Sequence, residues 1–175
     1  MSSNKSNWNS KYSQGVYTLI NPQKYIGNPL DIKFRSSWEQ AFCRYLDSND
    51  KIIKWGCEQP TITYFDLRGK SHRYFPDFYY EMIRNGDSNN YERVIVEIKP
   101  STELEPPRKP LNETGKALEN YEYAVRTHIK NKLKWSAATE FAQKNGMKFI
   151  IITEVILIKQ GLIPPKATYK KRRTK

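Results

Sequence analysis

The sequence has few cysteines and histidines, and it lacks a long hydrophobic run. Its two cysteines, Cys43 and Cys57, show no metal-ligand spacing and suggest no disulfide scaffold, so we expect a reducing, intracellular setting. No stretch reaches the roughly 18 apolar residues of a membrane-spanning helix, and none resembles the hydrophobic part of a signal peptide. A Gly-rich phosphate-binding loop is also missing, which disfavours an ATP-driven role.

Acidic residues are scarce as well. The chain has 18 Asp and Glu against 30 Lys and Arg, a formal charge of +12. This excess predicts a polyanionic partner, for which double-stranded DNA is the usual choice, while a membrane surface is disfavoured because no membrane-binding segment is evident. The chain from Lys166 onward holds six basic residues and no acidic one, and it either contacts DNA or is merely solvated. Its candidate DNA contacts are Lys170, Lys171, Arg172 and Arg173.

A chain of 175 residues is most simply one domain with appended segments. Only 38% of the residues are hydrophobic, but 12 Tyr, 7 Phe and 4 Trp supply large side chains for a core. We predict an N-terminal arm over residues 1–34, a folded domain over 35–160 and a basic tail over 161–175. The arm is rich in Asn, Ser, Lys and Tyr, and both an extended arm and a disordered terminus remain open for it.

Periodicity predicts an α/β fold with a mixed sheet flanked by helices. Apolar residues at helical spacing begin at Trp38, and the second helical pattern spans 116–144 with room for one break. The predicted strands cover 52–55, 61–65, 71–80, 93–99 and an apolar stretch over 147–158 that forms one long strand or two short ones. Residues 84–90 form a predicted polar loop. The long helix between the last two strand regions makes a parallel βαβ crossover plausible.

The residues that carry chemistry are concentrated in two short segments. Pro76 and Asp77 end an aromatic strand, and Glu97-Ile98-Lys99 follows twenty residues later. Strand alternation places Glu97 and Lys99 on one face and the apolar neighbours on the other. Two carboxylates offer hard oxygen ligands for Mg²⁺, and the lysine is suited to steering water or stabilising charge on phosphate during phosphodiester hydrolysis. The competing hypothesis is an ordinary row of ion pairs facing solvent.

A third carboxylate, Glu39, stands near the start of the first predicted helix. In Ser36-Ser37-Trp38-Glu39 it fits a capping box, in which Glu39 bonds back to the Ser36 amide. A carboxylate engaged in the cap is a poorer metal ligand, so Glu39 is either a ligand or a group that supports the ligands.

The chain resembles the PD-(D/E)xK nuclease superfamily over roughly residues 20 to 160. Within it, the motifs look like those of the head completion nucleases of tailed myophages and, more distantly, TnsA-type endonucleases of transposons. The segments that carry the resemblance are Arg35-Ser36-Ser37-Trp38-Glu39, Cys57-Glu58-Gln59-Pro60, Arg73-Tyr74-Phe75-Pro76-Asp77-Phe78, Val96-Glu97-Ile98-Lys99-Pro100 and Phe149-Ile150-Ile151-Ile152-Thr153-Glu154.

This resemblance implies a restriction-endonuclease-like core and a metal-dependent DNA endonuclease. Asp77 and Glu97 would be the main ligands of Mg²⁺, or of Mn²⁺ in its place, with the carbonyl of Ile98 and the carboxylate of Glu39 adding to them. Lys99 would position the attacking water. Glu58 matches a motif, but a structural hydrogen bond explains it equally well. Lys132 and Lys134, on the long helix, are candidate DNA contacts, and a solvated helix face accounts for them equally well.

The resemblance also implies a setting and partners. The enzyme would act on double-stranded DNA in phage head completion after packaging, in the host cytoplasm or in the virion, with portal or head proteins as further partners. Two alternatives remain: a structural protein that binds DNA ends without cutting, and a nuclease of the resolvase or transposition type. The oligomeric state is open.

Overall fold

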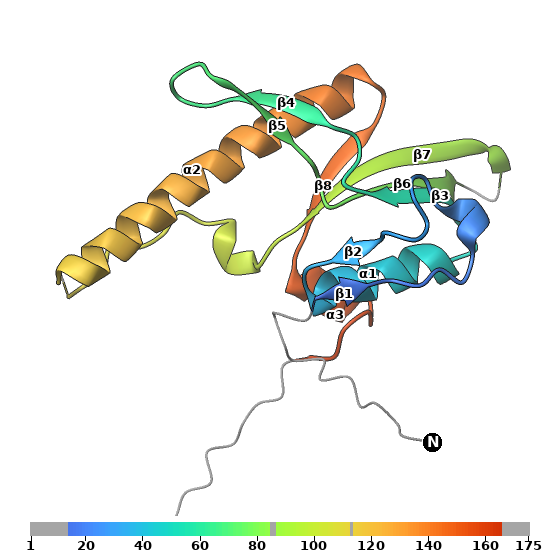
Figure 1. Cartoon of the computed structure of the whole chain (residues 1–175), viewed down its shortest axis with the longest axis horizontal. Helices are drawn as coiled ribbons and strands as arrows, with labels where there is room; N and C mark the ends of the chain where they lie inside the picture. Colours follow the sequence, from blue (N-terminus) through green and yellow to red (C-terminus); the bar gives the residue numbers. More distant parts are fainter. Residues whose placement is uncertain (1–13, 85–86, 113, 166–175) are drawn as a thin grey trace, which may run out of the picture.

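The computed structural model describes residues 14–84, 87–112 and 114–165. It shows a central four-stranded sheet with a layer of further elements on each of its two faces (Figure 1). The helices are η1 (Pro22–Lys24), α1 (Ser37–Ser48), η2 (Ser101–Glu103), α2 (Gly115–Lys144) and α3 (Glu154–Lys159), of which η1 and η2 are single 3-10 turns. The strands are β1 (Gly15–Val16), β2 (Lys33–Phe34), β3 (Ile52–Cys57), β4 (Ile62–Phe65), β5 (Ser71–Tyr74), β6 (Phe78–Arg84), β7 (Asp87–Ile98) and β8 (Lys148–Ile152).

The central sheet is mixed and has the order β3-β6-β7-β8. β3 pairs with β6 and β6 with β7 in antiparallel fashion, whereas β8 pairs with β7 in parallel. The parallel pair aligns Ile95 with Phe149 and Ile98 with Ile152, and α2 makes the crossover between the two strands. The predicted α/β architecture with a mixed sheet and a parallel βαβ unit is therefore confirmed.

The C-terminal part of β7, residues 94–98, is buried on both faces, which fixes its register. Val94, Val96 and Ile98 belong to a core shared with α1, α3 and the segment that precedes α1. Ile95 points the other way, into a second core with Ala138 and Ala142 of α2 and with the β4–β5 hairpin. Figure 1 shows the same division, with α2 and the hairpin on one side of the sheet and α1 and α3 on the other. A polar side chain on β7 is therefore held in a rigid setting.

Three local predictions were wrong. The strand predicted over 71–80 is interrupted at Pro76, because proline has no N–H for a ladder: β5 pairs with β4, and β6 pairs with β3 and β7. The predicted loop over 84–90 is shorter, since β7 already begins at Asp87. The apolar stretch over 147–158 is one short strand followed by α3. The helix predicted over 116–144 is confirmed, as one unbroken element from Gly115 to Lys144.

Residues 14–34 pack against α1 through the buried carboxylate of Asp47. This carboxylate accepts the Tyr17 hydroxyl at 3.0 Å, the Ile20 amide at 2.7 Å and the Asn21 amide at 2.9 Å. The Asp47 carbonyl accepts Lys24 Nζ at 3.2 Å. One side chain thus satisfies the donors of a segment that has little regular structure of its own. Over the described ranges, none of the helices combines the length and apolar character that crossing a membrane requires.

Replacing Asp47 by Ala should lower the free energy of unfolding by about 2–4 kcal/mol, because the buried Tyr17 hydroxyl and two backbone amides lose their acceptor. Urea denaturation followed by tryptophan fluorescence measures this loss. Asp50→Ala removes an exposed carboxylate near the same helix end and serves as the control. Equal midpoints for the two variants would show that Asp47 does not anchor the N-terminal segment.

Candidate active site

The structure brings Asp77, Glu97 and Lys99 together at one end of β7. Asp77 lies in the short link between β5 and β6, and its Oδ2 accepts the backbone N–H of Ile98 at 2.6 Å. Lys99 Nζ lies 3.1 Å from Glu97 Oε1. The Lys99 amide continues the parallel ladder to the Ile152 carbonyl at 3.0 Å. The interruption at Pro76 therefore turns Asp77 toward the next strand, beside the Glu97 and Lys99 side chains.

Glu97 is 4% exposed and is oriented by Tyr74, the last residue of β5. The Tyr74 hydroxyl donates to Glu97 Oε2 at 2.7 Å, while Lys99 contacts the other oxygen. Burial, followed by the Glu97 charge, raises the pKa of the Tyr74 hydroxyl, so the phenol stays a donor. This role of Tyr74 was not predicted from the sequence. The only signal for it in the sequence is a tyrosine three positions before Asp77.

Asp77 and Glu97 lie close together, and their repulsion shows in the pKa of Asp77. Burial and then the charge of Glu97 raise the pKa of Asp77 to about 8, although the Ile98 amide and the Lys99 charge act in the opposite direction. Burial works to lower the pKa of Lys99, but the charges of Glu97 and Asp77 outweigh it and the pKa is raised overall. Lys99 is therefore an ammonium ion at neutral pH, whereas Asp77 holds its proton until the pH approaches 8.

The predicted cap at Ser36 is confirmed, but the Glu39 carboxylate accepts the Arg35 amide and the Ser36 hydroxyl, where the sequence predicted the Ser36 amide. Glu39 also acts on the site at a distance. The Ser36 hydroxyl accepts the Glu39 amide at 3.1 Å, and Glu39 accepts the Ser36 hydroxyl at 2.9 Å and the Arg35 amide at 2.8 Å. The Glu39 charge contributes to the raised pKa of Asp77. The carboxylate is thus held by the N-terminus of α1 while its field reaches Asp77.

Glu58 supports the backbone at Asp77. Its amide donates to the Asp77 carbonyl at 3.2 Å, and its carboxylate lies 2.6 Å from the Arg35 guanidinium. Glu58 adopts a positive φ of 55°, which a non-glycine residue rarely does and which aims this amide at the link before β6. These contacts agree with the structural hydrogen bond that the sequence left as one of two explanations.

The two candidate lysines on α2 occupy different environments. Lys134 Nζ lies 5.1 Å from the centre of the Tyr74 ring, and burial lowers its pKa against the opposing effect of Glu97. Lys132 is exposed, roughly 200° around the helix from Lys134. Of the two, the structure brings only Lys134 to the carboxylates. The tail candidates lie outside the described residues, namely Lys170, Lys171, Arg172 and Arg173.

The donor chemistry of the site suits a hard divalent cation. Within the part of the chain that the structure describes, no group of three or more His, Cys, Asp or Glu side chains is close enough to form a ready-made metal site. Asp77 and Glu97 nevertheless present carboxylate oxygens at one point, and when both are ionised Lys99 offsets their charge only in part. Carboxylate and carbonyl oxygens are the ligands that Mg²⁺ takes in proteins.

The mixed sheet, with Pro76-Asp77 in a link beside Glu97-Ile98-Lys99 on the adjoining strand, is the arrangement of a PD-(D/E)xK nuclease, as the sequence resemblance predicted. Residues 49–154 match the family model described as TnsA-like endonuclease N terminal, and the chain belongs to this family. The chain is also 42% identical over 141 residues to the head completion nuclease of Enterobacteria phage T4, which covers 80% of this chain and 90% of that protein.

Asp77→Asn should stabilise the metal-free protein at neutral and mildly alkaline pH. The pKa of Asp77 is about 8 in the folded protein, above the value of about 3.9 for Asp in an unfolded chain. Between these values the unfolded chain releases the proton that the folded protein retains, so the stability of the native protein falls as the pH rises from about 4 to 8. Asn stays neutral and still accepts the Ile98 amide, which removes this loss.

Urea unfolding in EDTA at about pH 5 and about pH 8 measures the effect. The gain from Asp77→Asn should be larger at the higher pH by about 1 kcal/mol or more. Asp50→Asn, at an exposed carboxylate, should show no such difference. A gain for Asp77→Asn that is the same at both pH values would contradict the prediction.

Proposed function

We propose that the protein is a metal-dependent DNA endonuclease that acts in phage head completion. The observation that carries this proposal is the contact of Asp77 with the Ile98 amide at 2.6 Å, which sets a second carboxylate beside the pair formed by Glu97 and Lys99. Membership of an endonuclease family and similarity to a relative named head completion nuclease support it. The net charge of +12 favours double-stranded DNA as the substrate.

The proposed cofactor is Mg²⁺, with Mn²⁺ as an alternative. Asp77, Glu97 and the carbonyl of Ile98 would hold it, and Glu39 would complete the set if its carboxylate left the cap. The chemistry that such an ion supplies when bound is a lower pKa for water and neutralisation of charge on the scissile phosphate. The repulsion that raises the pKa of Asp77 is the kind of interaction that a cation between two carboxylates relieves.

Lys99 contributes as a cation and hydrogen-bond donor. Its raised pKa keeps the ammonium protonated, so it does not take a proton from water at neutral pH. One contact of Nζ goes to Glu97, which leaves the ammonium capable of donating to an attacking water and to a phosphate oxygen. Lys99 thus orients the nucleophile and stabilises the charge that develops during the displacement.

The setting follows from the similarity to the phage relative. We place the protein's action in the host cytoplasm during phage assembly or in the virion, with portal or head proteins as further partners. Among the described residues no base-reading element is evident, so contacts to the phosphate backbone would dominate binding and cutting would show little sequence preference.

Nicking of supercoiled plasmid in the presence of Mg²⁺ tests the proposal. EDTA should abolish nicking, and Lys99→Ala should reduce its rate at least about 100-fold, because the oriented ammonium is lost from the displacement. Asp77→Ala should do the same. Lys54→Ala, an exposed lysine on β3, is the control and should cut like the wild-type protein. Undiminished cutting by both site variants would disprove the assignment. If the wild-type protein binds DNA but does not cut it, a structural DNA-end-binding protein is favoured.

Tyr74→Phe should raise the Mg²⁺ concentration that nicking requires without abolishing activity. The variant keeps the ring but loses the 2.7 Å hydrogen bond that orients Glu97. Loss of such a supporting contact lowers metal affinity by about tenfold or more. The Mg²⁺ concentration for half-maximal nicking should therefore rise about tenfold. Tyr79→Phe removes a comparable hydroxyl bonded to Glu81 at 2.8 Å and should leave that concentration unchanged. An unchanged Mg²⁺ dependence for Tyr74→Phe would contradict a positioning role.

A further inference from the structure

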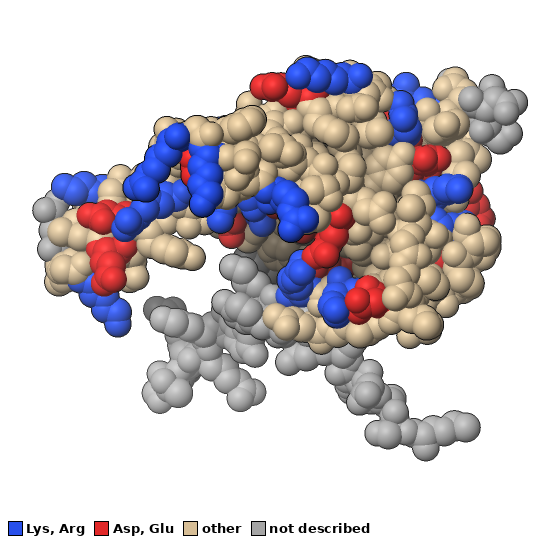
Figure 2. Space-filling view, turned by 45° about the horizontal axis from the view of Figure 1, so that its top comes forward, with Lys and Arg blue, Asp and Glu red and all other residues tan. Residues whose placement is uncertain are grey.

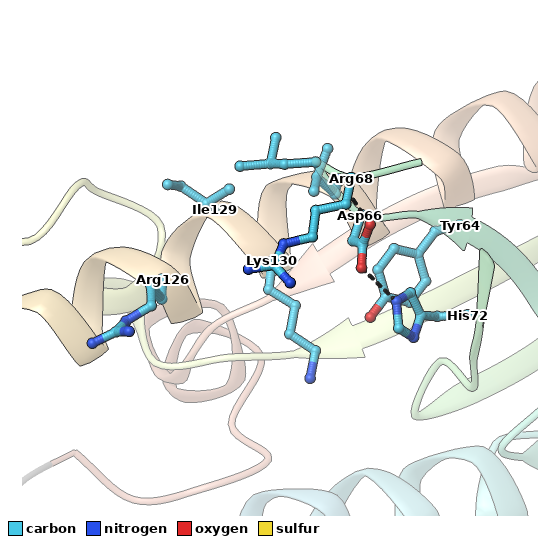
Figure 3. A pocket seen from close by; sticks show the side chains of 9 residues that line it. Tyr64, Asp66, Arg68, His72, Arg126, Ile129 and Lys130 are labelled. Carbon is cyan, nitrogen blue, oxygen red and sulfur yellow. Dashed lines mark hydrogen bonds and ion pairs between the residues drawn. The ribbon is translucent and has the colours of Figure 1, made fainter. Parts of the chain in front are cut away.

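A groove runs between the β4–β5 hairpin and α2, beside the site already described. Its volume is about 330 Å³, and its walls carry Tyr64, Arg68 and His72 from the hairpin and Arg126, Ile129 and Lys130 from the helix (Figure 3). We call this feature the hairpin groove. β4 pairs with β5 over its whole length and packs on α2, which fixes the hairpin against the helix, and Arg68 lies in the turn that joins the two strands.

The charge of the hairpin groove is positive. Arg68 lies on one wall and Arg126 and Lys130 lie on the other. Asp66 is the only acidic residue among the described residues that line it, and its carboxylate is occupied. It accepts the amides of Arg68 at 2.9 Å and Lys70 at 3.0 Å, and it lies 2.9 Å from His72 Nε2.

One other carboxylate meets the groove's cations. Glu122 lies 3.2 Å from the Arg126 guanidinium, but both side chains are mostly exposed, and such a pair contributes little. Figure 2 shows the wider pattern, in which Lys and Arg side chains follow α2 toward the centre of the molecule. The groove therefore presents cations that remain available to an anionic ligand.

Lys134 joins the hairpin groove to the catalytic residues. It lies four residues beyond Lys130 on α2, and its Nζ is 5.1 Å from the ring of Tyr74, whose hydroxyl contacts Glu97. Lys134 lies within reach of the charges of Lys130, Glu97 and Asp77. It therefore links the cations of the groove to the carboxylates.

The spacing of these cations matches a polyphosphate strand. Arg126, Lys130 and Lys134 recur every four residues and so follow one side of α2 over about 12 Å. A nucleic-acid strand presents its phosphates in a row, so these three cations can contact successive phosphates of one strand. A compact anion would need the cations to converge at one point, whereas here they are arranged along a line.

We propose that the hairpin groove binds the sugar-phosphate backbone of the DNA substrate through Arg68, Arg126 and Lys130, and directs the strand past Lys134 to Glu97 and Lys99. This inference rests on the proposed endonuclease function and assigns its substrate-binding surface. The inference also distinguishes Lys134 from Lys132, which the sequence gave as equal candidates for DNA contacts, because Lys132 points away from the groove.

Binding of a fluorescently labelled DNA duplex to the full chain, measured by anisotropy in EDTA over a range of salt concentrations, tests this surface. The groove variant carries Arg68→Gln and Lys130→Gln. The control variant carries Lys54→Gln and Lys132→Gln, which removes the same charge from exposed positions elsewhere. The groove variant should bind about tenfold more weakly near 0.1 M salt, and the slope of log affinity against log salt should fall by about 2 units, because two phosphate contacts are lost.

The control variant should stay within about twofold of the wild-type affinity and keep its salt slope. Equal losses in the two variants would mean that net charge or another surface holds the DNA, and would overturn the proposal. So would wild-type affinity in the groove variant, which would leave the groove to an acidic peptide. Circular dichroism melting of both variants verifies that each is folded.

Nicking by the same variants distinguishes failure of this inference from failure of the proposed function. If the wild-type protein binds DNA through the groove but never cuts with Mg²⁺, the groove stands and the endonuclease proposal fails. If the wild-type protein cuts and the groove variant matches the control in binding and cutting, only the groove fails. When both hold, the groove variant loses kcat/KM about tenfold and keeps kcat at saturating DNA.

Discussion

The hydrogen bond from the Ile98 amide to the Asp77 carboxylate is the contact on which the site depends. Asp77 lies outside the strands, in a link where Pro76 interrupts the ladder. Its position is fixed by this bond at 2.6 Å and by the Glu58 amide, which donates to the Asp77 carbonyl at 3.2 Å. Because residues 94–98 of β7 are buried on both faces, Ile98 cannot shift easily, and its amide holds Asp77 in place.

The same contact imposes an electrostatic cost. It sets Asp77 near Glu97, where burial and the second carboxylate raise the Asp77 pKa to about 8. Tyr74 and Lys99 satisfy the two oxygens of Glu97, so the cost falls mainly on Asp77. The buried carboxylates at this site thus lower the free energy of unfolding. Other contacts raise it, among them the hydrogen bonds of Asp47 that anchor the N-terminal segment.

Predictions from the sequence were correct where a local pattern determines the structure by itself. Alternation along β7 placed the Glu97 side chain on the other face of the strand from Val96 and Ile98. The cap at Ser36 followed from the three-residue spacing between Ser36 and Glu39. Predictions failed where tertiary contacts decide. The phase of β5 is lost across Pro76, so alternation did not place Tyr74 beside Glu97.

The end of the apolar stretch after β8 shows the same limit. A short apolar run fits a buried strand or a helix, and periodicity alone does not separate them. Here Glu154 begins α3 and accepts the Ser101 amide at 2.8 Å and the Ser101 hydroxyl at 2.6 Å. Ser101 is 53 residues away in the chain, so no local pattern contains this contact.

The length of α2 is the remaining feature that the crossover alone does not explain. Its 30 residues span about 45 Å, whereas the five residues of β8 extend over about 17 Å. The C-terminal part of the helix packs on the sheet through Ala138 and Ala142, and the rest projects beyond it (Figure 1). Arg126 and Lys130 stand on this projecting part, opposite the hairpin. The extra turns therefore do little for the core, and their physical effect is to place Arg126 and Lys130 opposite the β4–β5 hairpin.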